Sequence, residues 1–490
     1  MNGQIVRLTY VSLALVGVLV VMTTYWQTWA AAGLADRQDN AIKRVADFSV
    51  DRGLVFSWKP RKRLARNTER KVERKSLFFR RYPYGSLAAH VVGYSTVERS
   101  RTGLERSLND YLTASNASLS TLVDKALDEF RGKPVEGNDV VTTLDLDAQE
   151  VALAELGAQC GAVVALDPRT GKVRVMASSP SFDPNLVENN FAQISRIEAD
   201  CQPAAPLLNR ASAGLYVPGS TFKVITAAAA LESRKFKPES SFVDPGYCTV
   251  YGKRVNNFDT SSPFGTVDLE TALTYSVNSV FCNIGKTLGA KRILDTAKRF
   301  GFYERPPLET PTDERAPSGL YQRRQLYYPK QDPDVDAGRM AFGQERMLVT
   351  PLQMAMVAGA IGVGGELMEP QAVDKIVGPG GRILLRQRPA LIRQSVSKKT
   401  ADAVATMMRL AVERGTGTAA QLSGYSVGGK TGTGETGVPG ANTTWFIAFA
   451  GRDEERPAEL AIAVVLQNQS GTGGATAAPI ARAVMQAILS

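Results

Sequence analysis

No charged residue occurs between positions 8 and 35, near the start of this 490-residue chain. The stretch is strongly apolar in its first half, and Tyr25, Trp26 and Trp29 follow, as aromatic residues do at a membrane interface. About 20 apolar residues suffice to cross a bilayer as a helix, so the stretch predicts a membrane anchor. The small residues at 30–32 also fit a cleaved signal peptide. The length and the aromatic residues favour the retained anchor.

Basic charge is concentrated in one short segment of the chain. The net charge is +10, and residues 59–81 alone hold eleven basic and two acidic residues, a difference of +9. Such a segment is either the solvated face of a small domain or a contact for anions. Because the anchor places this segment outside the cytoplasm, nucleic acid is excluded as a partner. Lipid headgroups or a wall polymer remain as the candidate anions.

The length predicts two or three domains, and the texture of the sequence predicts an α+β chain in three parts. Residues 1–35 form a cytoplasmic tail and a transmembrane helix. Residues 36–139, which are polar, basic and irregular, form a small non-catalytic α/β domain that ends in a linker at 132–139. Residues 140–490 form a domain with a central antiparallel sheet flanked by helices. The expected elements are a strand leading into a helix at 140–156, strands at 161–167, 171–180, 445–451 and 459–468, and a terminal helix at 476–489.

The cysteines and the single histidine, His90, restrict the chemistry that is open to the chain. No two cysteines form a C-x-x-C pair, and one histidine does not suffice for the usual zinc sites. We therefore expect no zinc site. Four thiols permit three disulfide pairings outside the cytoplasm, and buried free thiols are an open alternative. The cysteines are Cys160, Cys201, Cys248 and Cys282.

A serine and a lysine three residues apart open an alanine-rich run after Pro-Gly, in the sequence STFK at 220–223. This pattern predicts the start of a helix. Residues three apart share a helix face, so Lys223 can reach the Ser220 hydroxyl and take its proton. A lysine is a base only when it is neutral, and burial beside a second cation can lower its pKa by about 3 units. The motif alone is weak, because Ser395 and Lys398 match it where we expect a helix start.

A second motif, S-x-N, follows at Ser276 and Asn278. It supplies a second hydroxyl and an amide. Ser107 and Asn109 show the same spacing, so the motif alone fits a polar loop or a helix cap equally well.

The third motif is the run KTGT at 430–433, which has a rival interpretation. Residues 424–431 also fit the phosphate-binding pattern G-x-x-x-x-G-K-T, which requires a helix directly after it. The loop-like sequence at 432–444 follows instead, so nucleotide binding is excluded. A strand with small residues at one edge lets a substrate backbone approach, and Lys430 can meet a carboxylate there.

In this order, the three motifs resemble the active site of penicillin-binding proteins and serine β-lactamases, which use S-x-x-K, S-x-N and K-T-G. The order is far more specific than any single motif. The resemblance covers essentially the whole chain and extends to residues 161–185, 209–211 and 341–355. The chain is thus similar to class B, monofunctional penicillin-binding proteins, and most like the actinobacterial penicillin-binding protein A type.

The resemblance implies a role for each motif residue. Ser220 attacks the carbonyl between two D-alanines of a peptidoglycan stem, and Lys223 accepts its proton. Ser276 relays this proton to the leaving D-alanine, while Asn278 positions the lysine and the substrate amide. Lys430 helps to keep Lys223 neutral and binds the terminal carboxylate, and the backbone N–H groups of the nucleophile and of the last motif residue form the oxyanion hole. The substrate-binding residues that accompany Lys430 are Thr431, Gly432 and Thr433.

The resemblance also implies a membrane-anchored D,D-transpeptidase that crosslinks stem peptides in cell-wall synthesis linked to cell division, and that needs no metal and no organic cofactor. Its catalytic domain would lie on the outer side of the cytoplasmic membrane, bind β-lactams, and work with a polytopic glycan polymerase and other wall-synthesis proteins. One alternative is hydrolytic, a D,D-carboxypeptidase or a β-lactamase; the long N-terminal region argues against the latter. The other is a non-catalytic divisome scaffold or β-lactam sensor, which the intact motifs disfavour. The acceptor amine and the choice between septation and elongation stay open.

Overall fold

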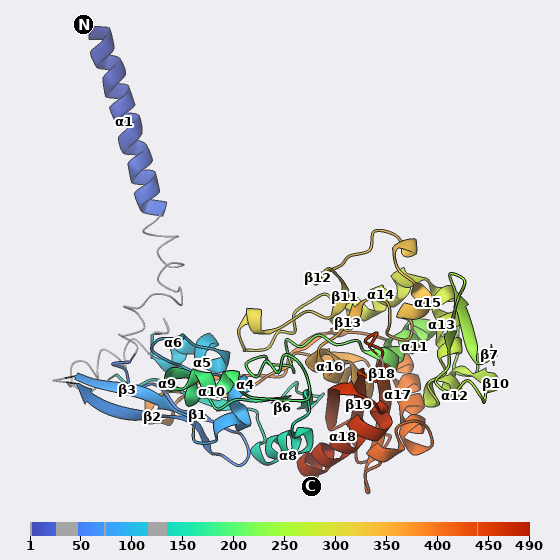
Figure 1. Cartoon of the computed structure of the whole chain (residues 1–490). Coiled ribbons are helices and arrows are strands. Elements are labelled where there is room, and N and C mark those ends of the chain that lie inside the picture. Colours follow the sequence, from blue (N-terminus) through green and yellow to red (C-terminus); the bar gives the residue numbers. More distant parts are fainter. Residues whose placement is uncertain (1, 26–47, 73–74, 116–134, 439) are drawn as a thin grey trace.

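The computed structural model of the chain describes residues 2–25, 48–72, 75–115, 135–438 and 440–490. Helix α1, Asn2–Tyr25, is the predicted apolar helix (Figure 1). None of it is buried against the protein, and it is long and apolar enough to cross a membrane. The choice between an anchor and a signal peptide depends in part on Trp26, Trp29 and residues 30–32, which lie outside the described residues. Residues 132–134 of the predicted linker also lie outside them.

The N-terminal region is built on a six-stranded sheet in the order β16-β15-β4-β1-β2-β3. Strand β4 lies near its middle, parallel to β1 and antiparallel to β15. The predicted boundary between residues 139 and 140 falls inside β4, and two strands come from the C-terminal part of the chain. The division into 36–139 and 140–490 therefore stays a prediction. The strands are β1 (Val55–Phe56), β2 (Arg63–Val72), β3 (Lys75–Arg81), β4 (Asp139–Thr142), β15 (Val373–Val377) and β16 (Ile383–Arg386).

The basic segment at 59–81 forms most of the β2–β3 hairpin, which projects from one end of the molecule (Figure 1). Three of its cations bind within the protein. Arg80 pairs with Glu105, and Arg61 and Arg70 each lie over an aromatic ring, at 4.9 and 5.2 Å from its centre. Both interpretations of the segment, a solvated face and a contact for anions, stay open.

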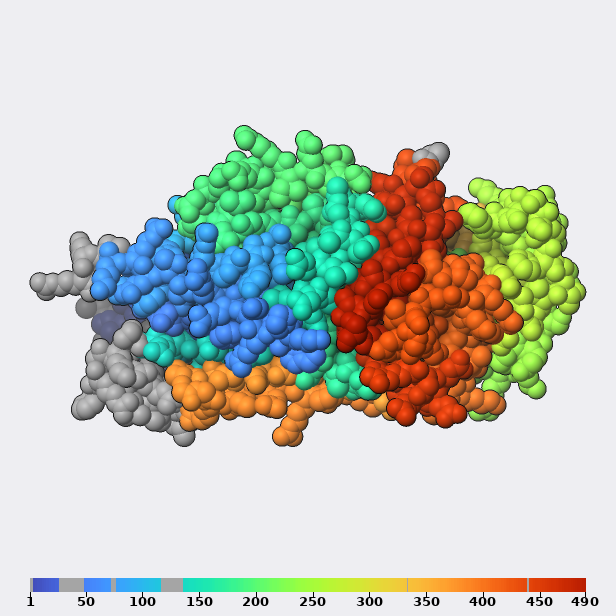
Figure 2. Space-filling view, turned by 90° about the horizontal axis from the view of Figure 1, so that it is seen from below, coloured from blue at the N-terminus to red at the C-terminus, as the bar shows by residue number. Residues whose placement is uncertain are grey.

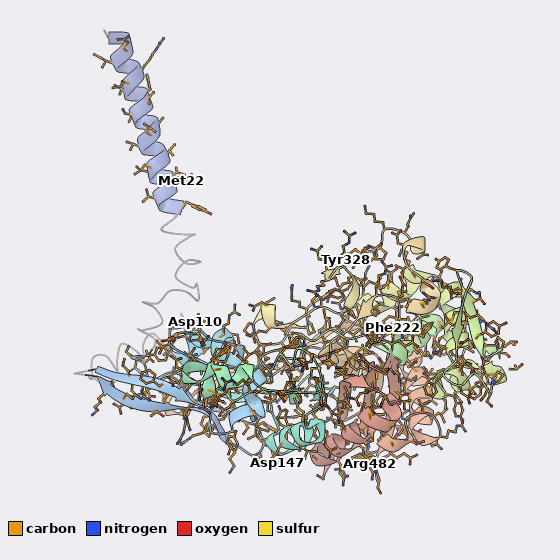
Figure 3. All side chains as sticks on the ribbon, viewed as in Figure 1. Met22, Asp110, Asp147, Phe222, Tyr328 and Arg482 are labelled. Carbon is orange, nitrogen blue, oxygen red and sulfur yellow. A yellow bond between two sulfur atoms is a disulfide. The ribbon has the colours of Figure 1, made fainter. Side chains whose placement is uncertain are left out.

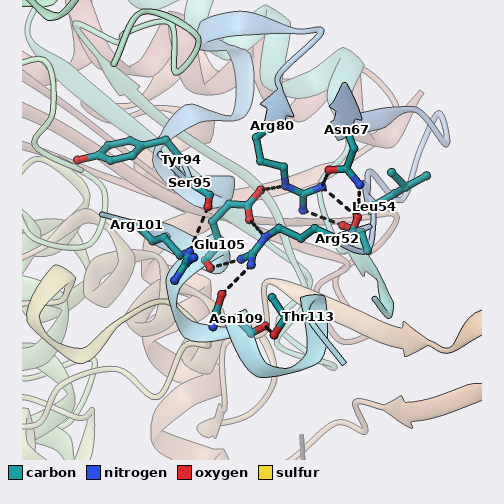
Figure 4. Close-up of polar contacts among 12 residues, drawn as sticks. Arg52, Leu54, Asn67, Arg80, Tyr94, Ser95, Arg101, Glu105, Asn109 and Thr113 are labelled. Carbon is teal, nitrogen blue, oxygen red and sulfur yellow. Dashed lines mark hydrogen bonds and ion pairs between the residues drawn. The ribbon is translucent and has the colours of Figure 1, made fainter. Parts of the chain in front are cut away.

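A buried carboxylate fastens this hairpin to the small helices beside it, α5 (Gly103–Ser107) and α6 (Asn109–Leu112). Glu105 is 0% exposed and lies between Arg52 and Arg80, each with its Nε 2.7 Å from the carboxylate (Figure 4). Burial alone would raise the pKa of Glu105, but the two guanidinium groups outweigh it and lower the pKa. Arg52 also donates to Asn109, so this second S-x-N match has a structural partner.

We expect Glu105→Ala to lower the free energy of unfolding by about 3–5 kcal/mol, because it leaves two buried guanidinium groups without their carboxylate. The contribution of Glu105 is present above the pKa that it has in the unfolded chain and is lost as the pH falls through its lowered folded pKa. Denaturant unfolding at neutral and acidic pH measures both effects. Glu69→Ala, on the exposed hairpin, is the control and should change stability by less than about 0.5 kcal/mol. Equal effects of the two substitutions would contradict the role of Glu105.

The larger part of the chain is organised by a five-stranded antiparallel sheet in the order β18-β19-β20-β5-β6. Helices α8 (Leu146–Leu156) and α18 (Gly473–Leu489) cover one face, where Asp147 and Arg482 mark them in Figure 3. Helices α16 (Pro351–Gly362) and α17 (Lys398–Glu413) cover the other. The predicted α+β class and both predicted strand pairs are confirmed. The strands are β5 (Gly161–Leu166), β6 (Val173–Ser179), β18 (Ser426–Gly434), β19 (Asn442–Gly451) and β20 (Leu460–Gln469).

Strand β18 decides the rival interpretation of the third motif. It runs without interruption through Lys430 and ends at Gly434, so no helix follows the lysine and the phosphate-loop alternative is excluded. Its small residues are needed for packing. A Cβ atom at Gly428 would lie 2.3 Å from the ring of Phe449, which crosses the strand. The edge that β19 does not cover faces the segment that carries Ser220.

A lobe of two short antiparallel strand pairs, β7 with β10 and β8 with β9, lies at the end of the molecule opposite the basic hairpin, in yellow-green in Figures 1 and 2. It packs against helix α13, Asn278–Leu288. A disulfide joins Cys248 on the lobe to Cys282 on α13, and a second joins Cys160 to Cys201, so all four cysteines are paired. The alternative of free thiols is thereby corrected. The lobe consists of β7 (Ser241–Asp244), β8 (Tyr247–Val250), β9 (Lys253–Asn256) and β10 (Gly265–Asp268).

Candidate active site

Ser220 lies in a tight turn, η3 (Gly219–Phe222), that leads directly into helix α11 (Lys223–Glu232). The turn is enclosed on two sides by backbone. Gly219 has a φ of +52°, and a Cβ atom there would lie 2.5 Å from the carbonyl oxygen of Thr433 on β18. A Cβ atom at Gly343, with a φ of +80°, would lie 2.0 Å from the Gly219 carbonyl. Two glycines thus let β18 and the segment at 341–347 close around the serine, which stays partly exposed. Phe222, two residues on, is buried (Figure 3).

Lys223 is completely buried, and its amine is held by the second motif. Nζ donates to the carbonyl oxygen of Ser276 at 2.7 Å and to Oδ1 of Asn278 at 2.6 Å, and it lies 3.2 Å from Oγ of Ser276. Within the described part of the chain, none of its hydrogen bonds goes to Ser220, which differs from the contact expected from their spacing. The physical reason is competition, because a carbonyl and an amide oxygen are better acceptors than a serine hydroxyl.

The third motif brings a second buried amine to the same serine. Nζ of Lys430 donates to Oγ of Ser276 at 2.8 Å and to the carbonyl oxygen of Thr431 at 3.0 Å. Burial lowers the pKa of Lys430 to about 7. Burial, and then the charge of Lys430, lower the pKa of Lys223 well below its ordinary value. The lowered pKa of Lys223 agrees with the expectation from the sequence, whereas the lowered pKa of Lys430 was not expected.

The second motif adopts a conformation that explains its contacts. Ser276 has a φ of +62°, which is uncommon for a residue other than glycine and turns the chain sharply before α13 begins at Asn278. This turn directs both the carbonyl and the hydroxyl of Ser276 towards Lys223. The amide of Asn278 uses its other end, Nδ2, to donate to the carbonyl oxygen of Asn256 at 3.0 Å.

The remaining residues of the third motif lie where the edge of β18 that no strand covers meets the nucleophile turn. Oγ1 of Thr431 shares a hydrogen bond of 2.7 Å with Oγ1 of Thr416, which fixes its rotamer. A Cβ atom at Gly432 would lie 2.7 Å from the carbonyl oxygen of Pro218, so a glycine is needed where β18 meets the nucleophile turn. Thr433 pairs with Thr444 of β19.

The other sequence matches lie elsewhere and are explained by structure. Ser397 caps α17 by accepting a hydrogen bond from the backbone N–H of Thr400, as expected for a helix start. Ser395 is buried and donates to a backbone carbonyl, and Lys398 is exposed and pairs with Asp402. The fold therefore assembles the five predicted catalytic residues from three distant motifs. They are Ser220, Lys223, Ser276, Asn278 and Lys430.

Two partners of the site were missed by sequence reasoning. Asn256 contributes only its backbone carbonyl, which leaves no pattern of side chains to detect. Thr416 lies in a loop between α17 and β18, and nothing in its neighbourhood distinguishes it from other loop threonines. By contrast, Gly343 lies in the segment at 341–355 that already entered the resemblance.

Comparisons with known proteins agree with this geometry. A family model described as the penicillin binding protein transpeptidase domain matches residues 161–486, and one described as the penicillin binding protein A dimerisation domain matches residues 52–140. The peptidoglycan D,D-transpeptidase PbpA of Mycolicibacterium smegmatis is 32% identical over 511 residues, covering 100% of this chain and 99% of that protein. PbpA of Mycobacterium tuberculosis is 31% identical over 517 residues, with the same coverage.

The fold is shared as well. The structure of penicillin-binding protein A from M. tuberculosis as an imipenem acyl-enzyme complex matches with a TM-score of 0.80 and 30% identity, covering 91% of this chain and 100% of that one. The penicillin G acyl-enzyme complex of the same protein matches with a TM-score of 0.78. By sequence and by fold, the chain belongs to the penicillin-binding protein transpeptidase family, and it is a serine-type D,D-transpeptidase.

Proposed function

We propose that this D,D-transpeptidase crosslinks peptidoglycan stem peptides through an acyl-enzyme on Ser220. The hydroxyl attacks the carbonyl between two D-alanines, the terminal D-alanine leaves, and the amine of a neighbouring stem displaces the enzyme. β-Lactams would acylate the same oxygen. The observation that carries the proposal is the set of hydrogen bonds around one buried lysine.

The amine of Lys223 suits the role of base because of how its hydrogens are used. A neutral amine has two N–H groups and one lone pair. The carbonyl oxygen of Ser276 and Oδ1 of Asn278 take up two N–H groups, at 2.7 and 2.6 Å. The third direction of the amine meets Oγ of Ser276 at 3.2 Å, so the lone pair can receive the proton of Ser220 when that contact gives way. The lowered pKa of Lys223 supports the neutral form at neutral pH.

Ser276 suits a relay because it lies between the two amines. Its Oγ accepts a hydrogen bond from Lys430 at 2.8 Å and is 3.2 Å from Nζ of Lys223. A proton that Lys223 receives can therefore pass through Ser276 to the nitrogen of the leaving D-alanine. Asn278 holds the lysine and, through the same amide, can meet the substrate.

The exposed edge of β18 suits a substrate that binds as an additional strand. Lys430 and Thr431 would bind the terminal carboxylate, with Gly432 letting the strand lie close to the nucleophile turn. The backbone N–H groups of Ser220 and Thr433 would stabilise the oxyanion, and one such donor is typically worth about 3–4 kcal/mol.

We expect the second-order rate constant for acylation by penicillin to fall as the pH rises through about 7, the lowered pKa of Lys430. This rate constant follows the ionisations of the free enzyme, and Lys430 attracts a carboxylate only while it is protonated. Lys223 titrates well below its ordinary range, so the base stays available. Stopped-flow acylation across the neutral and alkaline range tests this. A penicillin whose carboxylate is esterified is the control and should show no such fall; the same fall with the ester would contradict the role of Lys430.

Helix α1 suggests where the enzyme works. It is compatible with a single-pass anchor, and we propose that the catalytic domain lies on the outer side of the cytoplasmic membrane, where peptidoglycan is assembled. The family-model match at 52–140, described as a dimerisation domain of penicillin-binding protein A, supports a non-catalytic role for the N-terminal region. The same proposal includes two further points. The enzyme works with a polytopic glycan polymerase and other wall-synthesis proteins, and its activity is linked to cell division.

The full-length protein in detergent, given a donor peptide that ends in D-Ala-D-Ala and a peptide with a free amine as acceptor, tests the reaction. Mass spectrometry should detect the crosslinked product and released D-alanine. Release of D-alanine without crosslinking would favour a carboxypeptidase. Rapid turnover of a chromogenic cephalosporin would favour a β-lactamase, and no acylation at all would favour the scaffold or sensor.

A further inference from the structure

The carboxylate of Asp244 joins three segments beside the active site. Asp244 is the last residue of β7 and is 1% exposed. It accepts hydrogen bonds from the backbone N–H groups of Gly246 and Phe264, at 2.9 and 3.0 Å, and from the amide of Asn257, at 2.8 and 2.9 Å. The hydroxyl of Ser279 also donates to it. One buried group thus holds together the turn after β7, the loop between β9 and β10, and the first turn of α13.

The chain neighbours of two of these partners belong to the catalytic machinery. Asn256 precedes Asn257, and Asn278 precedes Ser279. The carbonyl oxygen of Asn256 accepts from Nδ2 of Asn278, while Oδ1 of Asn278 accepts from Lys223. A side-chain amide has one donor end and one acceptor end. The position of the Asn256 carbonyl therefore determines which end of the amide faces Lys223.

The direction of this amide decides whether Lys223 can act as a base. With Oδ1 towards the lysine, Asn278 takes up an N–H group and does not occupy the lone pair. With the amide turned end for end, its NH₂ group would donate to that lone pair and occupy it. The lysine would then have lost an acceptor, and an amide N–H group would occupy the lone pair that has to receive a proton.

We infer that Asp244 is a positioning residue for the acylation step: by fastening Asn257 and Ser279, it keeps the Asn256 carbonyl in place and the acceptor end of Asn278 on Lys223. The inference rests on the proposed function, in which Lys223 is the base. Asp244 acts through Asn278 and touches neither the substrate nor the reacting atoms.

The lobe has other attachments, so it should fold without this carboxylate. The disulfide between Cys248 and Cys282 ties it to α13. Strands β7 and β10 pair along four residues. Loss of the Asp244 hydrogen bonds should therefore free the loop that carries Asn256 while the lobe stays in place.

The first test is Asp244→Asn, which keeps the shape but turns one acceptor oxygen into a donor that faces other donors. The second-order rate constant for acylation of the full-length protein by fluorescent penicillin should fall about tenfold. Asp145→Asn is the matched control, because Asp145 is 2% exposed, caps α8, where asparagine caps equally well, and has Arg174 rather than a catalytic group as its charged neighbour. The control should be acylated at the wild-type rate, and an unchanged rate in Asp244→Asn would overturn the inference.

The second test is a double-mutant cycle with Asn278→Ala. If Asp244 acts through the Asn278 amide, Asp244→Asn should have almost no further effect once that amide is gone. A full tenfold fall in the Asn278→Ala background would show that Asp244 acts by another route, and would overturn the inference even though the first test had succeeded.

The third test exchanges the two side chains, as Asp244→Asn with Asn257→Asp. The amide–carboxylate pair is restored in reverse, and residue 257 can still accept from the backbone N–H of Ser279, as Oδ1 of Asn257 does at 3.0 Å. Acylation should recover to within about threefold of the wild type. If Asp244→Asn alone shows no cooperative thermal unfolding, the exchange variant becomes the deciding test of the inference. A folded exchange variant whose acylation rate constant stays tenfold below that of the wild type would overturn the inference.

Failure of the inference and failure of the proposed function give different results. A wild-type protein that penicillin does not acylate, or a Ser220→Ala variant that it does, would count against the proposed function. An acylated wild type together with an unaffected Asp244→Asn variant would count against the positioning role alone.

Discussion

Ser220→Ala is expected to abolish covalent labelling by fluorescent penicillin, because the substitution removes the hydroxyl that the proposed mechanism uses as its nucleophile. Loss of a catalytic nucleophile typically lowers the rate on the order of 10⁴-fold or more. Ser220 is partly exposed, whereas Lys223 behind it is buried, so alanine should be accommodated without loss of stability. Labelling of the purified protein, followed by gel fluorescence and intact mass, measures the result.

Ser395→Ala is the matched control for this experiment. Ser395 and Lys398 repeat the spacing of Ser220 and Lys223, but Ser395 is buried and donates to the carbonyl oxygen of Arg299 at 3.0 Å. The control should be labelled like the wild type. An adduct that survives in Ser220→Ala and disappears in Ser395→Ala would mean that the nucleophile had been assigned to the wrong serine.

Lys223→Arg should lower the acylation rate by about 10²–10⁴-fold, the usual contribution of a general base. Arginine keeps the positive charge and much of the length, but it does not deprotonate in proteins and has no lone pair to offer. The experiment thus separates a base from a residue that only supplies charge. Burst kinetics with penicillin give the rate, and thermal unfolding shows whether the buried site has accepted the larger group.

Lys398→Arg provides the comparison for this second prediction. The side chain of Lys398 is 77% exposed and pairs with Asp402 one helical turn away, an interaction that arginine can also make. The acylation rate of the Lys398→Arg variant should equal that of the wild type. If Lys223→Arg retained more than about a tenth of the wild-type rate, a positive charge rather than a base would be what the site needs at this position.

The strands of the catalytic sheet could be predicted from the sequence because the relevant signal is local. The runs at 161–167 and 445–451 are apolar and bounded by turn residues, so pattern alone identifies strands. The same locality explains why the N-terminal sheet was not foreseen. Strands β15 and β16 join it from more distant sequence, and a short strand carries no mark of its partner.

The active site was predictable to the extent that side chains carry its chemistry. Ser220, Asn278 and Lys430 were found because the order of three motifs is specific, although two of those motifs recur elsewhere in the chain. The direction in which the Lys223 amine points could not be predicted, because it depends on the backbone carbonyl of Ser276. The pairing of the four cysteines was equally inaccessible, since spacing alone permits three arrangements.

The position of β4 has a consequence for how the protein is made. This strand lies between β1 and β15, and the chain reaches β15 only after residues 143–372 have been synthesised. Until then one edge of β4 has no partner, and an unpaired edge invites association with other chains. The N-terminal sheet therefore stays incomplete until residues 373–377 have been synthesised, and during that interval the open edge of β4 depends on the rest of the chain to protect it from association.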